Sequence, residues 1–183
     1  YNNFQTYATI KHITFRYESN FSYMNVWFDK EKMDSILENV ISNALKYTPK
    51  NGDILISVYD MKSSWRLEVK DNGIGIPAKE QRKLFKMHFR GTNAINSKIT
   101  GSGIGLMLVR KLVSLHNGKI YIESTEHQGT TVRITLPKEK EQFKSFTLSV
   151  KDKKSIHEPD VPTAPLKLAG ELRTEEDNDK LQR

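Results

Sequence analysis

The sequence predicts an α+β fold, and three observations carry that prediction. Two stretches, residues 30–47 and 104–116, repeat apolar residues at helical spacing. A third observation is a set of short stretches that alternate apolar and polar residues and are separated by turn residues, namely residues 54–58, 65–69, 119–123 and 131–136. Because consecutive strands joined by short turns pair side by side, we expect a mostly antiparallel sheet.

The first part of the chain is expected to hold two strands and a long helix. Residues 13–17 and 25–28 are predicted as short strands with a polar stretch between them. Asp29 is a good N-cap for the helix over residues 30–47, and Thr48-Pro49 ends that helix. This helix is the most regular element that the sequence predicts.

A hairpin follows and leads into a long connection. Met61-Lys62-Ser63 joins the strands over residues 54–58 and 65–69, so the second strand ends at Asp71. Residues 76–103 hold one short amphipathic piece around residues 79–85 and otherwise little periodicity. Loops of that length in a compact domain are usually functional.

The second helix leads into the last pair of strands. Asn117-Gly118 is expected to end the helix over residues 104–116 as a left-handed cap. Gln128-Gly129 forms the turn of the final strand pair, and Pro137 ends it. We therefore expect one domain over residues 1–139, followed over 140–183 by a charged, proline-containing linker or disordered tail.

Composition sets limits on function. The 183 residues include no Cys, which excludes disulfides and thiolate metal sites, and no apolar run long enough to span a bilayer. The net charge of +7 makes an acidic partner plausible. However, Lys and Arg are scattered among acidic residues and no stripe of base-stacking aromatics accompanies them, so we expect no direct nucleic acid binding.

Three polar clusters in a fixed order are the main functional signal. Asn39, Asn43 and Lys46 follow i, i+4, i+7 spacing and leave one face of the predicted helix. An Asn oxygen suits a hard cation and Lys46 could reach a phosphate. The alternative for this cluster alone is a solvated helix surface.

The second cluster is Asp71-Asn72-Gly73-Ile74-Gly75. A buried carboxylate here could accept a hydrogen bond from the exocyclic amine of adenine, while Gly73 and Gly75 let the backbone approach a flat ligand. The alternative is a strand-to-loop turn that uses Asp and Gly for its geometry.

The third cluster, Gly101-Ser102-Gly103-Ile104-Gly105, runs directly into the helix over residues 104–116. Free amide groups at a helix N-terminus bind phosphate, although a hinge would use the same glycines. The spacing differs from the dinucleotide fingerprint, and the Gly-Lys-Ser/Thr phosphate loop and the eukaryotic-type kinase signatures are absent. Together with the other two clusters, this loop indicates an ATP site.

In sequence order, residues 37–49, the Asp71 motif, residues 84–90 and residues 101–106 resemble the N, first glycine, F and second glycine boxes of sensor histidine kinases. Gly129-Thr130 is similar to the closing Gly-Thr of that family. The resemblance covers roughly residues 4–137. It implies the two-layer α/β sandwich shared with gyrase-type ATPases, with a mixed, mostly antiparallel sheet, helices on one face and a long ATP lid.

The resemblance also implies roles for single residues. Asn43 would ligate Mg²⁺ with Asn39 close by, Lys46 and Tyr47 would contact the phosphates, and Asp71 would bind adenine. Phe85 and Phe89 would anchor the lid, and Arg90 is a candidate for contact with the γ-phosphate. The residues expected to bind ATP are Asn43, Lys46, Tyr47, Asp71, Gly73, Gly75, Ile76, Phe85, Gly101, Ser102, Gly103, Ile104, Gly105, Leu106 and Thr130.

Asn39 distinguishes between relatives. ATPases of this superfamily carry a Glu at that position as the general base that activates water, and Asn cannot take a proton. Glu38 is adjacent but points about 100° away around the helix. We therefore expect phosphoryl transfer to a supplied nucleophile. A gyrase-like ATPase clamp and a non-catalytic nucleotide-responsive module remain the alternatives.

The nucleophile is expected to lie outside this chain. His157-Glu158 is similar to an acceptor pair, but Pro159 denies it a helix. The resemblance implies two partners: a dimerisation domain bearing the acceptor histidine, and a response-regulator receiver domain in cis or in trans. It also implies a cytoplasmic segment of a sensor anchored in the inner membrane, with a hybrid kinase as one possible parent.

Overall fold

The computed structural model describes residues 2–96 and 102–139. Its helices are α1 (Asn2–Ile10), α2 (Lys30–Tyr47), α3 (Ala78–Gln81), α4 (Thr92–Asn96) and α5 (Gly105–Leu115). Its strands are β1 (Thr14–Ser19), β2 (Asp53–Asp60), β3 (Ser64–Asp71), β4 (Lys119–Thr125) and β5 (Gly129–Pro137).

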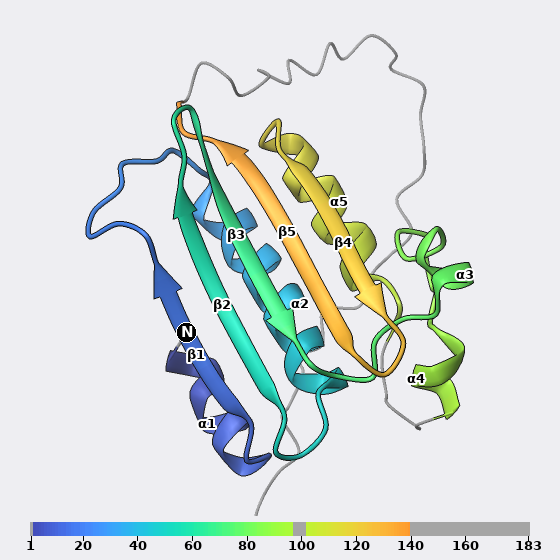
Figure 1. The fold of residues 1–183 in the computed structure, drawn as a ribbon. Helices are drawn as coiled ribbons and strands as arrows, with labels where there is room; N and C mark the ends of the chain where they lie inside the picture. The colour runs from blue at the N-terminus through green and yellow to red at the C-terminus, as the bar shows by residue number, and fades with distance from the viewer. Residues whose placement is uncertain (1, 97–101, 140–183) are drawn as a thin grey trace, which may run out of the picture. The chain divides into compact units, whose positions relative to one another are not determined.

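The strands form one mixed sheet in the order β1-β2-β3-β5-β4. β1 and β2 run parallel, and the other neighbouring pairs are antiparallel. Helices α2 and α5 lie side by side against one face of the sheet (Figure 1). This arrangement confirms the α+β fold with a mostly antiparallel sheet and helices on one face.

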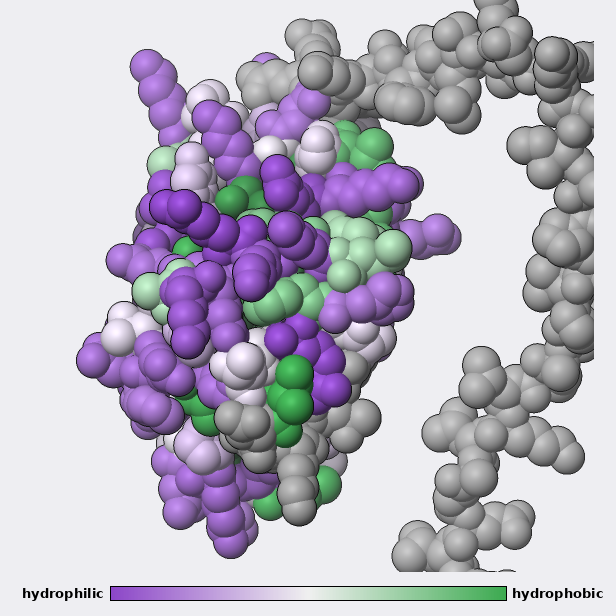
Figure 2. Space-filling model, turned by 90° about the vertical axis from the view of Figure 1, so that its right-hand side faces the viewer, coloured by the Kyte–Doolittle hydropathy of each residue, from purple (hydrophilic) through white to green (hydrophobic). Residues whose placement is uncertain are grey.

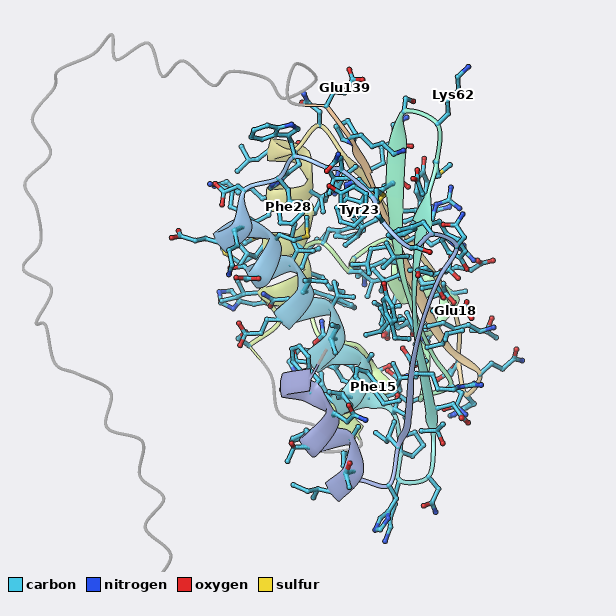
Figure 3. The ribbon with its side chains drawn as sticks, turned by 90° about the vertical axis from the view of Figure 1, so that its left-hand side faces the viewer. Phe15, Glu18, Tyr23, Phe28, Lys62 and Glu139 are labelled. Atoms are coloured by element: carbon cyan, nitrogen blue, oxygen red, sulfur yellow. The ribbon has the colours of Figure 1, made fainter. Side chains whose placement is uncertain are left out.

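The core lies between the helical layer and the sheet. Figure 3 views the two layers from the side, with Phe15 of β1 between them and Glu18 on the solvent side of the sheet. Ile36 of α2, Ile54 of β2 and Val109 of α5 are each 0% exposed. Burial of the apolar stripes therefore fixes which side of α2 faces the sheet and which side is left for polar residues.

The helix α2 begins where the sequence predicts. The Asp29 side chain accepts a hydrogen bond from the N–H of Lys32 at 3.1 Å, which caps the helix. The buried ring of His116, at the end of α5, accepts the N–H of Asp29 on Nε2 at 3.2 Å. Since Nε2 is an acceptor, the proton lies on Nδ1, which faces the Leu112 carbonyl at 2.8 Å. The end of α5 thus secures the start of α2.

The strand predicted over residues 25–28 is wrong. This stretch is an irregular segment in which the N–H of Trp27 donates to the carbonyl of Lys138 at 3.1 Å without continuing into a strand ladder. Val26 packs partly buried against the core, and the ring of Phe28 lies 6.2 Å from that of Trp65. Val26 and Phe28 therefore make packing contacts with the core and with Trp65, and the segment forms no strand.

Two helices were not predicted. Helix α1 packs Ala8, 1% exposed, into the core, although residues 2–10 show no strong apolar stripe. Helix α4 lies within residues 76–103, which we call the lid, where the sequence predicts one amphipathic piece. In that piece the structure forms the short helix α3, and residues 97–101 of the lid lie outside the described residues.

The lid side of the domain is mostly hydrophilic. Seen from the side on which β4, α5 and the lid helices lie, hydrophobic residues appear in small separate areas (Figure 2). Among residues 2–96 and 102–139, no helix is long and apolar enough to cross a membrane. The predicted linker or tail over 140–183, including His157, falls outside the described residues, so the predicted boundary at 139 stays a prediction.

Candidate nucleotide site

A cavity of about 290 Å³ opens between α2, the end of β3, the lid and the start of α5. Each of the three polar clusters contributes to its lining. The lining residues include Asn39, Asn43, Lys46, Tyr47, Asp71, Ile74, Gly75, Ile76, Phe89, Arg90, Asn93, Ser102, Gly103, Gly105, Leu106 and Thr130. The volume is near the lower end of the range for small-molecule sites.

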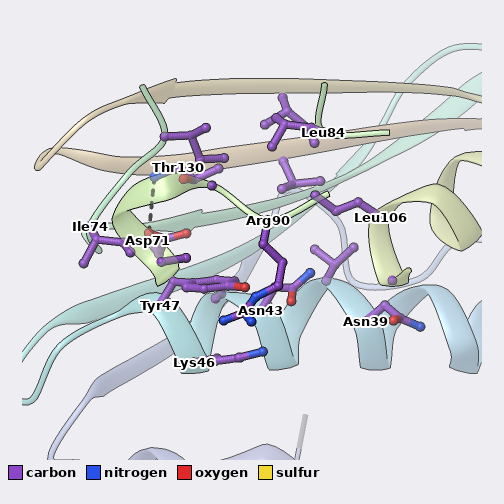
Figure 4. Close-up of a pocket in the computed structure, with 18 of the residues that line it drawn as sticks. Asn39, Asn43, Lys46, Tyr47, Asp71, Ile74, Leu84, Arg90, Leu106 and Thr130 are labelled. Atoms are coloured by element: carbon purple, nitrogen blue, oxygen red, sulfur yellow. Dashed lines mark hydrogen bonds between the residues drawn. The ribbon is translucent and has the colours of Figure 1, made fainter. Parts of the chain in front are cut away.

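One face of α2 forms a polar wall of the cavity. Asn39, Asn43, Lys46 and Tyr47 follow one another along the helix, as Figure 4 shows. The Nδ2 group of Asn39 donates to the carbonyl of Ser35 at 2.8 Å, which leaves its oxygen directed away from its own helix. Lys46 Nζ lies 5.2 Å from the centre of the Tyr47 ring. Glu38 is exposed and is not among the residues that line the cavity.

Asp71 ends β3 and is 8% exposed. Its Oδ1 accepts the N–H of Gly73 at 2.8 Å. It also accepts the N–H of Thr130 at 3.2 Å, the bond that is dashed in Figure 4. Burial raises the pKa of Asp71 to about 6, although these two hydrogen bonds favour the carboxylate. Within the described residues both hydrogen bonds fall on Oδ1, so Oδ2 remains as an acceptor toward the cavity.

Gly75 lets the backbone beside Asp71 approach the end of β4. Its φ is +62°, and a Cβ there would lie 1.9 Å from the carbonyl oxygen of Thr125. Asn93 of α4 holds the same turn from the lid, because its Nδ2 donates to the Gly75 carbonyl at 2.7 Å. Any side chain at Gly75 would push this edge of the cavity apart.

Gly105 begins α5 and allows that helix to meet α2. A Cβ at Gly105 would lie 2.5 Å from Asn39 Oδ1. The N-cap residue of α5, Ile104, makes no side-chain hydrogen bond to the first turn of the helix, and its own N–H donates to Ser102 Oγ at 3.4 Å. Among the described residues, the N–H groups of the first turn therefore have no capping side chain. Ser102, Gly103 and Gly105 all line the cavity there, which is the arrangement that favours an anion.

Two cations stand at the same part of the cavity. Arg90 reaches from the lid toward Asn43 and Lys46 (Figure 4). Burial lowers the pKa of Lys46, and the positive charge of Arg90 lowers it further. Burial raises the pKa of Tyr47, whereas Arg90 acts to lower it. Like charges brought together at a partly buried site indicate a place for an anion.

Glu80 fixes the second half of the lid. Its carboxylate accepts the N–H of Thr92 at 3.0 Å and the Thr92 hydroxyl at 2.7 Å. The Thr92 hydroxyl is the main cause that holds the pKa of Glu80 below its usual value. Gln81 donates to the carbonyls of Ser124 and Ile76 at 2.7 and 3.1 Å. These side chains attach the lid helices to the base of the cavity.

Some predicted site residues do not line the cavity. Gly73 lies behind Asp71 as its hydrogen-bond donor, and Ile104 lies at the N-cap of α5. The ring of Phe85 instead contacts Arg110, whose guanidinium carbon lies 5.1 Å from the ring centre. Gly101 lies outside the described residues.

Sequence reasoning missed most of the apolar lining and Asn93. Val40 and Ala44 belong to the periodic stripe of α2, and Val69 and Val132 to the inward positions of β3 and β5, so periodicity could have placed them. Asn93 lies in a stretch without periodicity, and its contact with Gly75 carries no local signal.

The family comparison agrees with this geometry. Residues 28–140 match the family described as "Histidine kinase-, DNA gyrase B-, and HSP90-like ATPase". The sensor histidine kinase WalK of Bacillus subtilis is 40% identical over 119 residues, which cover 64% of this chain and 20% of that protein. The sensor protein kinase WalK of Staphylococcus aureus is 39% identical over 112 residues, 60% of this chain and 27% of that protein.

Solved structures show the same fold. The catalytic domain of histidine kinase ThkA has a TM-score of 0.67 and 29% identity, over 78% of this chain and 89% of that one. ThkA in complex with response regulator protein TrrA has a TM-score of 0.64 and 27% identity, over 76% of this chain and 38% of that one. The chain therefore belongs to the histidine kinase-, DNA gyrase B- and HSP90-like ATPases, with the fold and relatives of the ATP-binding domain of sensor histidine kinases.

Proposed function

We propose that this domain binds Mg-ATP and transfers the γ-phosphoryl group to a histidine on a helical hairpin outside the chain. The observation that carries the proposal is the sharing of one cavity by a buried carboxylate, Asp71, and two cations, Lys46 and Arg90. An adenine amine requires an acceptor and a polyphosphate requires cations. The family assignment and the WalK relatives, of which this chain spans about a fifth to a quarter, support the same function.

The described residues fit a nucleotide. Oδ2 of Asp71 is the acceptor for the base, and Ile74 and Ile76 supply apolar contact beside it. In this proposal Lys46, Tyr47 and the first turn of α5 hold the phosphate oxygens, which is supported by their lining the same cavity. When bound, Mg-ATP supplies the transferable phosphoryl group and the divalent charge that stabilises its transfer.

A magnesium ion would be held through Asn43. No group of three or more His, Cys, Asp or Glu side chains that could hold a metal occurs in the described ranges 2–96 and 102–139. An amide oxygen is a weak ligand by itself, and Mg²⁺ usually keeps phosphate and water ligands. We propose that the metal arrives with the nucleotide, with Asn43 as its protein ligand and Asn39 beside it.

Transfer to a partner is favoured over hydrolysis because α2 presents amides to the cavity. Neither Asn39 nor Asn43 can accept a proton from water, and Glu38 on the same helix is exposed. We propose that the acceptor histidine belongs to the dimerisation domain of a membrane-anchored sensor. A response-regulator receiver domain is the proposed next partner, since ThkA is described in complex with a response regulator.

The test has two stages. First, the affinity of the 183-residue chain for Mg-ATP is measured by calorimetry. The chain is then incubated with γ-labelled Mg-ATP and the histidine-bearing hairpin of the parent protein. Transfer of an acid-labile, base-stable label to the hairpin supports the kinase proposal. ATP binding without transfer would indicate a nucleotide-responsive module, and steady release of phosphate without the hairpin would indicate an ATPase clamp.

A further inference from the structure

The last turn of α2 presents four carbonyl groups that lack partners within the helix, as every α-helix does. Thr48 satisfies the first of them, because its N–H and its hydroxyl donate to the Ala44 carbonyl at 3.0 and 2.7 Å. The carbonyls of Leu45, Lys46 and Tyr47 need donors from other parts of the fold. This turn matters for function because Lys46 and Tyr47 both line the cavity.

Lys11 supplies most of these donors. Its Nζ donates to the carbonyl of Leu45 at 2.7 Å, to that of Thr48 at 2.8 Å and to that of Lys46 at 3.5 Å. An ammonium group has three N–H donors, so these three carbonyls use all of them. The remaining carbonyl, that of Tyr47, accepts the N–H of Ile74 at 3.1 Å.

Helix α1 and the turn after it place Lys11. Ala8 anchors α1 in the core at 1% exposure, and its carbonyl accepts the N–H of Ile13 at 2.8 Å. Between them His12 takes a left-handed conformation with φ of +54°, which turns the chain into β1. Lys11 is thereby directed at the C-terminal end of α2, where the helix dipole favours a positive charge.

Lys11 lies outside the cavity lining, yet it holds the backbone of residues that form the lining. Lys46 and Tyr47, the proposed phosphate contacts, stand on the turn that its ammonium group caps. Ile74, beside the base, is held by the Tyr47 carbonyl and not by Lys11. We propose that Lys11 is a positioning residue for the phosphate end of the nucleotide site, and that through it α1 is coupled to nucleotide affinity. This inference rests on the proposed function.

The test compares Lys11→Met with Lys30→Met in the 183-residue chain. Lys30→Met is the control because it also removes one positive charge from the helical layer. Lys30 pairs with Asp34 at the exposed start of α2, away from the capped turn. Calorimetry gives the Kd for Mg-ATP and for adenosine, and thermal unfolding gives Tm. We expect Lys11→Met to weaken Mg-ATP about tenfold, which corresponds to about 1.4 kcal/mol, and adenosine less than about twofold.

The selectivity between the two ligands separates positioning from stability. A fall in Tm with unchanged Mg-ATP affinity, or equal weakening of Mg-ATP and adenosine, would show that Lys11 is a structural cap and would overturn the inference. If Lys11→Met does not fold, Lys11→Arg decides, because it keeps the charge but not the compact three-donor geometry. Lys11→Arg should bind Mg-ATP more weakly and adenosine almost unchanged. An equal weakening of both ligands would overturn the inference. Failure of the unmodified chain to bind Mg-ATP would refute the proposed function instead.

Discussion

Replacing Asp71 with Asn should stabilise the nucleotide-free domain and at the same time remove its affinity for ATP. Asp71 is buried at the end of β3, and burial raises its pKa to about 6 from an ordinary value of 3.8. Asn has nearly the same shape, and its Oδ1 can still accept the N–H groups of Gly73 and Thr130. The substitution therefore removes the charge while keeping the local hydrogen bonds.

The magnitude follows from the two pKa values. Between pH 3.8 and about 6 the folded chain holds more protons at Asp71 than the unfolded chain, so the free energy of unfolding falls as the pH rises through this window. Above it, the ionised carboxylate costs the folded state about 3 kcal/mol, at about 1.4 kcal/mol per tenfold change in proton affinity. The Asn amide keeps part of the desolvation cost, so we expect a gain of about 1–2 kcal/mol at pH 7.

Nucleotide binding should change in the opposite direction. An Asn whose oxygen stays on the Gly73 and Thr130 N–H groups presents its NH₂ to the amine of adenine, which places two donors face to face. Losing the charged acceptor and leaving a donor unsatisfied costs about 3 kcal/mol or more, which is a loss of more than about 100-fold in Kd.

The assay is urea unfolding at pH 7 and pH 4.5, with ATP calorimetry at pH 7. Asp34→Asn is the control, because Asp34 is an exposed carboxylate on α2. Between pH 7 and pH 4.5 the cost of the ionised carboxylate falls from about 3 to about 1 kcal/mol, so the stability of Asp71→Asn relative to the unmodified chain should fall by about 2 kcal/mol. This fall removes or reverses the advantage of the variant at pH 4.5, and the exposed control should not show it. A variant that is less stable than the unmodified chain by the same amount at both pH values would refute the reasoning about burial. Unchanged ATP affinity would show that Asp71 does not bind the base.

Three further predictions concern other parts of the site. Gly105→Ala should weaken ATP binding more than about tenfold because its Cβ would meet Asn39 Oδ1 at 2.5 Å, and adding Asn39→Ala should restore part of the affinity, as calorimetry can show. Removal of Mg²⁺ with a chelator should reduce ATP affinity in the unmodified chain but not further in Asn43→Ala; equal losses would exclude Asn43 as the ligand. His116→Ala should lower the free energy of unfolding by about 2–3 kcal/mol in urea, since it removes two buried hydrogen bonds, and should leave ATP affinity unchanged.

The regular elements could be predicted because their signals are local. The stripe from Met33 to Leu45 repeats at helical spacing, and the helix occupies Lys30–Tyr47 as expected. Asn117 adopts a φ of +52° after α5, which is the left-handed cap that its sequence predicts. The three polar clusters meet at one cavity because each lies on or beside the end of a regular element that packs in the core.

The parts that could not be predicted depend on contacts between distant residues. Helix α1 is stabilised by packing Ala8 against the core and not by its own propensity. Residues 25–28 pair with no strand of the described residues, although they hold a short run of residues that favour strands. The bonds of Lys11 to the end of α2 and of Asn93 to Gly75 join a side chain to a remote carbonyl. No spacing in the sequence encodes such a bond, so its residues look like ordinary surface positions.

The pairing of β3 with β5 has a consequence for how this family can vary. Asp71 lies opposite Thr130 in the sheet, so the ladder closes an excursion that contains the lid, α5 and β4. Closing a loop that is already long depends only weakly on its length, and ten inserted residues would cost only about 0.1–0.2 kcal/mol. The lid can therefore be lengthened, shortened or rewritten at little cost while the Asp71 carboxylate keeps its register in the sheet.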